Sequence, residues 1–371
     1  MRKLLRHWPL TLAALLAVCC GVCVWRLWAV SNCLPSQKAA QRWQGTGERS
    51  FAQVSCYMPP TFNMKLDEIY KFRNDMAQKL KGASYDLERE KGLYSDAWST
   101  SGTVKVANGR RSGEVQVFAV GGNFFDFHPL RLVSGSYLTP NDVMDDRVLL
   151  DKETAWLLFG ASDVAGLSFS LEGIPMVVAG VYEHEQDAFS RAASGDTRRI
   201  FMHYSAFRRL YAGDSKLTQD VINSILAVSC YELVTAEPVK GFAYGSVTDK
   251  FPYKAGNNEN ILVNTYRFEL SQLYRLLKNR MQRSMRTGAW VYPYWENAAR
   301  AAEDRASLWL LGAAVTGALP AGLVLYWVIR SLVRGKKKLQ DDVLPDAKAK
   351  GREFFREQSR RRWEKKHPGE Y

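Results

Sequence analysis

The chain has 371 residues and a formal net charge of +13, with 51 Lys and Arg against 38 Asp and Glu. The excess is uneven: residues 330–371 carry +7, three cations precede residue 8, Arg26 adds one, and only +2 remains for the rest. This distribution indicates membrane topology and argues against nucleic acid as a partner, because a nucleic-acid-binding protein spreads basic charge over its folded surface.

An apolar segment of 23 residues runs from Trp8 to Val30. At ~1.5 Å per residue, it is long enough to cross a bilayer core of ~30 Å. Arg26 interrupts it near the far end, where its side chain can reach the membrane interface. We therefore predict that residues 1–30 hold a cytoplasmic start and a first transmembrane helix, with a cleaved signal peptide as the alternative. The predicted interfacial side chains are Trp8, Trp25, Arg26 and Trp28.

A second apolar segment, Leu308 to Ile329, contains 22 residues and no charge. Cations precede the first segment and follow the second, so both termini are predicted to be cytoplasmic and the region between them extracytoplasmic in the cell membrane. The predicted divisions are an outer domain at 31–306, a second transmembrane helix at 307–330 and a basic cytoplasmic tail at 331–371. Trp309, Trp327 and Arg330 are further interfacial candidates, and the tail is expected to contact anionic membrane lipid.

Periodic patterns in the outer domain predict both helices and strands. Apolar residues at helical spacing predict helices over 64–80 and 265–284, and a third that starts near Glu296 and continues into the second span. Strands are expected over 51–57, 93–99, 104–107 and 115–120, with a turn at Asn108-Gly109. A long strand or a strand pair is expected over 222–234. Polar stretches at 190–199 and 255–260 are interpreted as exposed loops, and 351–366 as a short helix.

The central stretch from Gly121 to Asp187 shows the clearest order of elements. It starts with an aromatic turn at 123–127, followed by a strand at 147–150. A helix over 153–159 stops at Gly160. Two further strands, 167–171 and 175–181, flank a turn at Glu172-Gly173.

This order of elements resembles the MacB-like periplasmic core domain, which is the extracytoplasmic part of FtsX-like ABC transporter permeases. The resemblance implies an α+β outer domain, in which a porter-like strand-helix-strand lobe is assembled from both chain ends and a β-rich lobe is inserted between them. The positions that carry it are Phe125, Gly135, Asp142, Val148, Ala155, Leu158, Phe159, Gly160, Asp163, Gly166, Val177, Val178, Ala179, Gly180 and Val181.

The sequence contains no recognisable catalytic or cofactor-binding motif. His184-Glu185 resembles the start of a zinc-protease motif, but Ala188 stands where the second histidine is required. The other histidines, at 7, 128, 203 and 367, show no ligand spacing. A phosphate-binding loop and a Gly-x-Ser-x-Gly elbow are also absent. We therefore expect no catalytic, cofactor or metal site and no enzymatic activity.

Six cysteines are divided between the first span and the outer domain. Disulfides persist outside the cytoplasm, so the outer cysteines are the candidates for pairing. A sheet built from both chain ends, as the resemblance implies, makes the strands through Cys56 and Cys230 neighbours and allows a disulfide there. Three free thiols in the outer domain are the alternative. The span holds Cys19, Cys20 and Cys23, and the outer domain holds Cys33, Cys56 and Cys230.

The resemblance implies a non-enzymatic membrane subunit of an ABC-type export or signalling complex. Its outer domain would transmit motion or engage a substrate or an envelope partner. The expected partners are a separate ABC ATPase, permease subunits, or further chains in a homo- or hetero-oligomer. FtsX-like permeases carry three further spans after the outer domain and this chain carries one, which predicts an accessory or half-sized component. The alternative is a membrane-anchored sensor or binding module without ATPase coupling.

Overall fold

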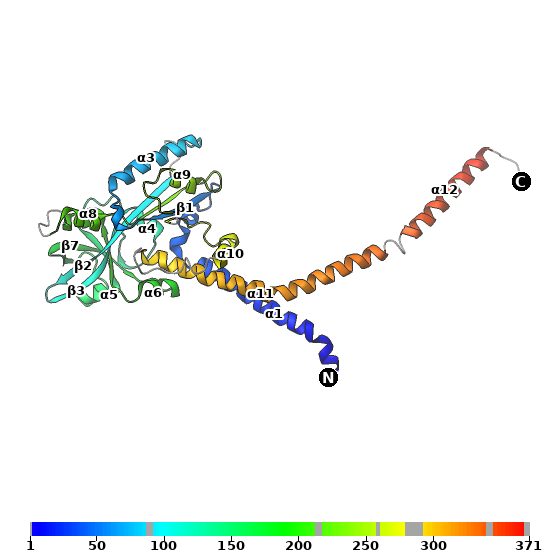
Figure 1. The fold of residues 1–371 in the computed structure, drawn as a ribbon, viewed down its shortest axis with the longest axis horizontal. Coiled ribbons are helices and arrows are strands. Elements are labelled where there is room, and N and C mark those ends of the chain that lie inside the picture. The colour runs from blue at the N-terminus through cyan, green and yellow to red at the C-terminus, as the bar shows by residue number, and fades with distance from the viewer. Residues whose placement is uncertain are drawn as a thin grey trace. The chain divides into compact units, whose positions relative to one another are not determined.

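The computed structural model describes residues 2–86, 92–211, 217–256, 260–278, 292–338 and 344–366. The chain falls into two compact units. The helical unit comprises Met1–Trp25 and Leu311–Tyr371, and the sheet unit comprises Arg26–Leu310. All the strands labelled in Figure 1 belong to the sheet unit.

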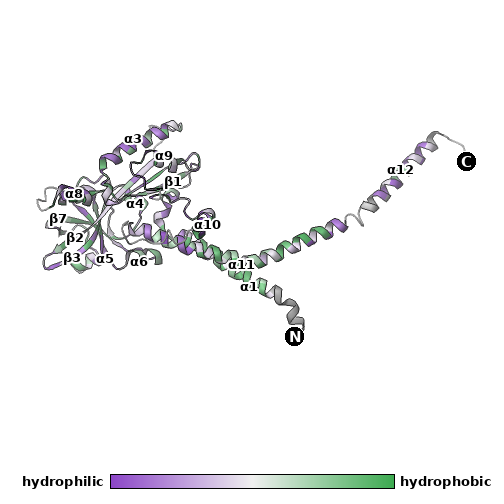
Figure 2. Cartoon of the chain, viewed as in Figure 1, coloured by the Kyte–Doolittle hydropathy of each residue, from purple (hydrophilic) through white to green (hydrophobic). Residues whose placement is uncertain are grey.

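Three helices contribute to the helical unit: α1 (Arg2–Asn32), α11 (Tyr294–Lys338) and α12 (Leu344–Lys366). By length and composition, α1 and α11 are suited to cross a membrane. Figure 2 shows long hydrophobic stretches on both of them. The helix expected in the tail is present as α12, and the helix expected from Glu296 into the second apolar segment is present as α11.

Small residues bring α1 and α11 close together within the helical unit. A Cβ added to Gly312 would lie 3.1 Å from Cys23 Sγ, and one added to Gly317 would lie 3.1 Å from Cys20 Sγ. Cys20 Sγ also donates to Ala313 O at 3.4 Å. Glycine at these positions lets the two helices approach without a clash.

The residues assigned to the membrane interface remain predictions. The side chains of Trp25, Trp28 and Trp327 are exposed, as side chains that face a bilayer interface must be. Arg330 lies 5.9 Å from the ring centre of Tyr326. The side chain of Trp8 lies outside the part of the chain that the structure describes.

A single ten-stranded sheet forms the centre of the sheet unit. Its order is β10-β1-β9-β2-β3-β8-β5-β7-β4, and β6 pairs with β2 and β7 off this path. The mixed α and β class predicted for the outer domain is confirmed. The strands are β1 (Phe51–Tyr57), β2 (Tyr94–Asn108), β3 (Arg111–Gly122), β4 (Arg131–Gly135), β5 (Arg147–Asp151), β6 (Ser168–Leu171), β7 (Ile174–Glu183), β8 (Arg199–His203), β9 (Cys230–Ala236) and β10 (Ile261–Val263).

One end of the sheet is built from both ends of the outer domain, as predicted. β1 leads through α3 (Leu66–Gly82) to β2, and β9 lies between these two strands, antiparallel to both. In α3, Ile69, Phe72 and Met76 are buried at helical spacing. The helix α9 (Phe242–Lys250) packs beside α3. Together these elements form the strand-helix-strand half of the domain.

The hairpin of β2 and β3 joins this half to the inserted half. It turns at Gly109 and Arg110, one residue later than expected, because Asn108 still pairs with Arg111. Beyond it lie β8, β5, β7 and β4, with α5 (Lys152–Phe159) and α7 (Tyr204–Tyr211) packed on the strands. The inserted half therefore shares one continuous sheet with the first. The smaller helical elements are η1 (Pro35–Lys38), α2 (Ala39–Gln44), η2 (Pro60–Phe62), α4 (Phe124–Phe127) and α10 (Leu270–Lys278).

Several local expectations need correction. The stretch 190–199 was expected to be an exposed loop, but it contains the end of α6 (Ala188–Ser194) and the buried first residue of β8. Asp187 caps α6 by accepting the backbone N–H groups of Phe189 and Ser190. The stretch 222–234 begins in α8 (Gln219–Leu226) before it enters β9, because a short apolar run fits a helix and a strand equally well.

Other boundaries differ less. The predicted strands 93–99 and 104–107 are parts of the single strand β2. The helix expected over 265–284 is present as α10 within the described residues, while 279–284 lie outside them. The loop expected over 255–260 includes residues 257–259, which also lie outside the described part.

The candidate disulfide between Cys56 and Cys230 is not formed in the structure, in agreement with the alternative of free thiols at these two positions. β1 and β9 are neighbours, as predicted, but their register pairs Cys56 with Tyr231 and Tyr57 with Cys230. Successive side chains of a strand point to opposite faces of a sheet, so the two thiols lie on opposite faces. Cys56 packs in one buried hydrophobic cluster and Cys230 in another. Both cysteines are free and buried.

Candidate functional site

The first turns of α11 carry charged side chains inside the sheet unit. Glu296, Arg300 and Glu303 follow one another at spacings of four and three residues, which places them on one face of the helix. Each has at most 3% of its surface exposed. The apolar segment Leu308 to Ile329 begins five residues after Glu303 in the same helix.

Arg267, in the segment before α10, lies between two of these carboxylates. Its Nε donates to Glu303 Oε1 at 2.7 Å, and Nη1 and Nη2 donate to the two carboxylate oxygens of Glu296 at 2.7 and 2.8 Å. Nη1 also donates to Gln37 Oε1 at 3.1 Å, and Nη2 to Glu303 Oε2 at 3.3 Å. All five N–H donors of the guanidinium group therefore find acceptors. We call Arg267, Glu296, Arg300 and Glu303 the α11 charge cluster.

Arg300 and Tyr57 complete the surroundings of Glu296. Arg300 Nε donates to Glu296 Oε1 at 2.7 Å, and its guanidinium carbon lies 4.0 Å from the ring centre of Tyr292. The hydroxyl of Tyr57, at the end of β1, donates to Glu296 Oε2 at 3.1 Å. The cluster thus ties α11 to β1, to Gln37 in η1 and to the segment before α10.

Two guanidinium groups and two carboxylates balance in charge within this cluster. Burial alone would raise the pKa of Glu296, but the guanidinium groups of Arg267 and Arg300 lower it to about 2. Burial also acts to lower the pKa of Arg267, and the carboxylates of Glu296 and Glu303 outweigh it and raise that pKa well above its ordinary value. Removal of one partner from such a buried pair costs ~3–5 kcal/mol, because the other charge stays buried without compensation.

A second buried polar group connects β1 and β9. Ser55 Oγ donates to Glu232 Oε1 at 2.8 Å, and His128 Nε2 contacts Glu232 Oε2. The imidazole ring of His128 packs on Trp295, with 4.5 Å between ring centres. The carboxylate lies between the serine and the histidine, so His128 is bonded to the acid and not to the hydroxyl. This is not the arrangement of an activated serine nucleophile, in which the base contacts the hydroxyl.

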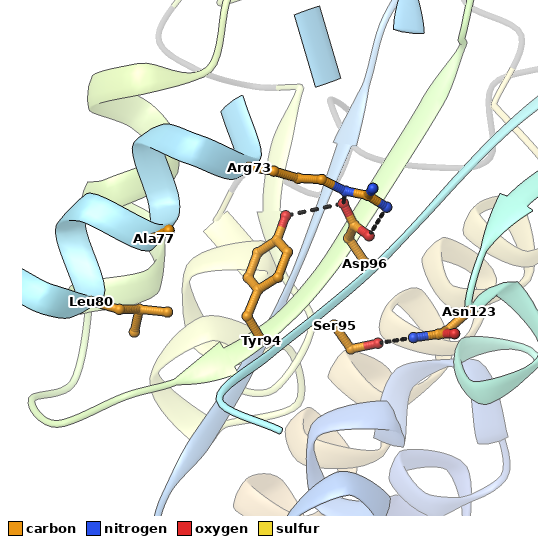
Figure 3. Close-up of a pocket in the computed structure, with 7 residues that line it drawn as sticks. All are labelled: Arg73, Ala77, Leu80, Tyr94, Ser95, Asp96 and Asn123. Atoms are coloured by element: carbon orange, nitrogen blue, oxygen red, sulfur yellow. Dashed lines mark hydrogen bonds and ion pairs between the residues drawn. The ribbon is translucent and has the colours of Figure 1, made fainter. Parts of the chain in front are cut away.

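A cavity of about 360 Å³ opens between α3 and the start of β2. Figure 3 shows Arg73 reaching from α3 to Asp96, with Nε and Nη2 donating to the two carboxylate oxygens at 2.8 and 2.6 Å. The Tyr94 hydroxyl donates to the same carboxylate at 3.1 Å, and Asn123 Nδ2 donates to Ser95 Oγ at 2.9 Å. The lining residues are Arg73, Ala77, Leu80, Tyr94, Ser95, Asp96 and Asn123.

The Arg73 guanidinium gives this cavity a charged edge. Burial acts to lower the pKa of Arg73, but its hydrogen bonds to Asp96 and the charge of that carboxylate raise it above the ordinary value. The side chain is 32% exposed, and its guanidinium carbon lies 4.9 Å from the ring of Trp98. The ion pair of Arg73 with Asp96 and the hydroxyl groups of Tyr94 and Ser95 give the cavity polar groups that can bind a small polar ligand.

The family-motif residues shape the backbone. Gly135 and Gly180 are paired across β4 and β7, and a Cβ at Gly135 would lie 2.2 Å from Ala179 O. Gly160 ends α5 with a φ of 75°, and Asp142 closes a turn by accepting the backbone N–H of Thr139 at 3.1 Å. Phe125, Phe159 and Val181 pack in the hydrophobic clusters, and Gly166 has a φ of 85°.

Sequence reasoning missed the α11 charge cluster. Its signal was present, since Glu296, Arg300 and Glu303 share one helical face directly before an apolar span. Charges at that place are also expected at an exposed membrane flank, and the partner Arg267 is not distinguished by any local motif. Only the packed structure identifies the pairing.

These elements define a mixed α and β domain, and comparison with known proteins shows what its central part resembles. Residues 61–240 match the sequence model of the MacB-like periplasmic core domain. The resemblance seen in the sequence is therefore confirmed for this region.

Solved structures with a similar fold include two domains of transporter proteins. The periplasmic region of MacB from Actinobacillus actinomycetemcomitans is 14% identical, with a TM-score of 0.38 over 65% of this chain and 98% of that one. The extracellular domain of the noncanonic ABC-type transporter YknZ from Gram-positive bacteria is 13% identical, with a TM-score of 0.35 over 58% of this chain and 99% of that one. None of the curated proteins compared matches the sequence.

Proposed function

We propose that this chain is a non-catalytic, membrane-anchored subunit of an ABC-type transport complex, and that α11 passes motion between the membrane and the outer domain. The MacB-like core domain at 61–240 supports this class of complex. The mechanical part rests on α11 itself. This one helix contributes both the buried charges Glu296, Arg300 and Glu303 and the apolar segment Leu308 to Ile329.

The α11 charge cluster makes the start of this helix a firm connection. Rotation or sliding of α11 against the sheet would separate Arg267 from Glu296 and Glu303 and leave buried charges unpaired. At ~3–5 kcal/mol for a broken buried pair, this movement is strongly disfavoured. Displacement of α11 would therefore move the sheet unit with it, because the start of the helix cannot slide or rotate against the sheet.

In this proposal residues 31–306 lie outside the cytoplasm, the segments at 1–30 and 307–330 anchor the chain in the cell membrane, and the tail at 331–371 reaches anionic lipid and a cytoplasmic ATPase. The placement of the cations supports this orientation. A reporter enzyme that works only in the cytoplasm should be active when fused after Tyr371 and inactive when inserted after Gly256. The reverse pattern would show that the orientation is wrong.

Co-purification tests the proposed partner. The tagged full chain is isolated at its native level in mild detergent, and the eluate is analysed by mass spectrometry and for ATP hydrolysis. We expect an ATP-binding-cassette ATPase, a multi-span permease, or both, in near-stoichiometric amounts.

A variant tests the mechanical part of the proposal. Arg267→Met, which loosens α11, should retain the partner and lose the effect of the chain on the partner's ATP hydrolysis. Lys240→Gln, which removes an exposed ion pair with Glu269, is the matched control. Recovery of neither partner contradicts the proposal.

The cavity beside Arg73 supports a second candidate function, that of a membrane-anchored binding module without ATPase coupling. Native mass spectrometry of the purified chain distinguishes it. A bound small molecule that is present in the wild type and absent from Arg73→Ala, together with the absence of an ATPase, would favour this function over the first.

A further inference from the structure

Asp151, Glu153 and His184 meet at one edge of the sheet. β5 and β7 are parallel neighbours, so their carboxyl ends lie at the same edge. Asp151 is the last residue of β5, Glu153 lies in the first turn of α5, and His184 directly follows β7. One carboxylate oxygen from each acid and one imidazole nitrogen all lie within 4.8 Å of one another.

The distances between these atoms are close to those between ligands of one metal ion. His184 Nε2 lies 2.9 Å from Asp151 Oδ2 and 3.7 Å from Glu153 Oε2. Two ligands of a tetrahedral zinc ion, each ~2.0–2.1 Å from the metal, stand ~3.3 Å apart. The two distances from the imidazole nitrogen bracket that value, and one oxygen of each carboxylate lies within 4.8 Å of the other.

The local charges also favour a divalent cation. Asp151 is fully buried, and Glu153 is partly exposed to solvent. Among the described residues, His184 is the only side chain capable of positive charge that lies within 4 Å of either carboxylate. Three cations lie nearby. Lys152 and the largely exposed Arg131 pair with Glu183, and Arg199 pairs with Glu185 while the charge of Asp151 also raises the pKa of Arg199.

The surroundings hold Asp151 in the orientation of a ligand. Its Oδ1 accepts the backbone N–H of Thr154 at 2.7 Å, and Oδ2 accepts the backbone N–H of Arg199 at 2.7 Å. Hydrogen bonds of this kind orient ligating carboxylates. The Thr154 hydroxyl is buried and has no hydrogen-bond partner among the described residues. It belongs to the third residue of α5, directly after Glu153.

We propose that Asp151, Glu153 and His184 bind one divalent transition-metal ion, with zinc the best match and water as its fourth ligand. An imidazole with two carboxylates suits zinc, whereas calcium and magnesium take sets of oxygen ligands. The site goes beyond the proposed transport function and does not depend on it.

Zinc titration of the purified full chain tests this site. The protein carries an affinity tag without histidine, is treated with a chelator, and is titrated with ZnCl₂ by calorimetry in detergent. We expect one ion per chain with micromolar or tighter affinity, and a rise in melting temperature with zinc. His184→Ala and Glu153→Gln should each weaken binding at least tenfold. Glu153 is about half exposed, so its replacement leaves the fold intact.

His203→Ala is the matched control. His203 is as buried as His184, but it contacts one carboxylate, that of Asp142, at 3.2 Å. This variant should bind zinc as the wild type does. The proposal is overturned if the wild type does not bind zinc, or if binding persists unchanged in both His184→Ala and Glu153→Gln, which would assign the ion to thiols or to another site.

Discussion

The α11 charge cluster and the group around Asp151 both bury charges in the sheet unit, but they differ in how completely those charges are paired. Arg267 uses all five of its N–H donors on three acceptor residues. Arg199 is also fully buried, yet its Nε and Nη1 have no hydrogen-bond partner among the described residues, and Nη2 reaches Glu185 at 3.3 Å. Every N–H donor of Arg267 is therefore paired, whereas Arg199 keeps donors without a hydrogen-bond partner among the described residues.

Arg199 tolerates these unpaired nitrogen atoms because an aromatic ring and a partly exposed acid surround it. The Arg199 guanidinium carbon lies 3.9 Å from the ring centre of Tyr294, whose hydroxyl donates to Glu185 at 2.6 Å. The side chain of Glu185 is 22% exposed, whereas that of Glu296 is fully buried. Water can therefore reach one acid and not the other. Complete pairing, and not burial alone, makes the α11 charge cluster a firm structural connection.

Loss of Arg267 is expected to have the largest effect. Arg267→Met leaves Glu296 and Glu303 buried with Arg300 as the only remaining cation of the cluster, and should lower the free energy of unfolding by ~3–5 kcal/mol. Urea unfolding of the full chain in detergent, followed by tryptophan fluorescence, measures this. Lys240→Gln, in an exposed pair, should cost less than ~1 kcal/mol. Equal effects of the two variants would contradict the closed character of the cluster.

The pKa of Glu296 leads to a related loss of stability in acid. This pKa is lowered from 4.5 to about 2 in the folded chain, so ionised Glu296 stabilises the fold above pH ~4.5, and the contribution is lost as the pH falls toward ~2. We expect the unfolding free energy of the wild type to fall over this range by a few kcal/mol. Glu296→Gln should be less stable at neutral pH and show a shallower fall. Parallel curves for both proteins would contradict the assignment.

Loss of Arg199 should have a smaller effect than loss of Arg267. In Arg199→Met, Glu185 keeps its hydrogen bond from Tyr294 and gains water. The substitution also removes from the core two nitrogen atoms that have no hydrogen-bond partner among the described residues. We expect a cost of ~1–2 kcal/mol, since the desolvation penalty of Arg199 disappears with it. The same unfolding measurement decides the order. A cost as large as that of Arg267→Met would remove the distinction between the two clusters.

The smallest effects are expected for Cys56 and Cys230. Cys56→Ala and Cys230→Ala each remove one buried sulfur, at ~1 kcal/mol apiece, and the two costs should add because the side chains lie on opposite faces of the sheet. In the oxidised chain unfolded without reductant, both thiols should react with an alkylating agent. A double variant no less stable than either single one would instead indicate a bond between them.

Local chemistry explains why much of the inserted half was predictable. Asp151 begins α5 by capping it, and Gly160 ends it, so both boundaries are encoded within a few residues. The hairpin turn at Gly109 and Arg110 is likewise local. The failures at 190–199 and 222–234 occurred where short segments take their form from burial against the sheet. Arg199 illustrates this, because an arginine next to a polar stretch is usually exposed.

The sequence by itself determined the two apolar segments, the basic flanks and the order of elements of the MacB-like core, because length, charge and periodicity are properties of consecutive residues. The tertiary structure decided which charges meet and which face each cysteine occupies. Tyr57 and Arg267 reach Glu296 from 239 and 29 residues away. A register shift of one residue would exchange the two faces for every side chain of β1. Such contacts depend on how strands and helices are aligned in space, and no local pattern contains that alignment.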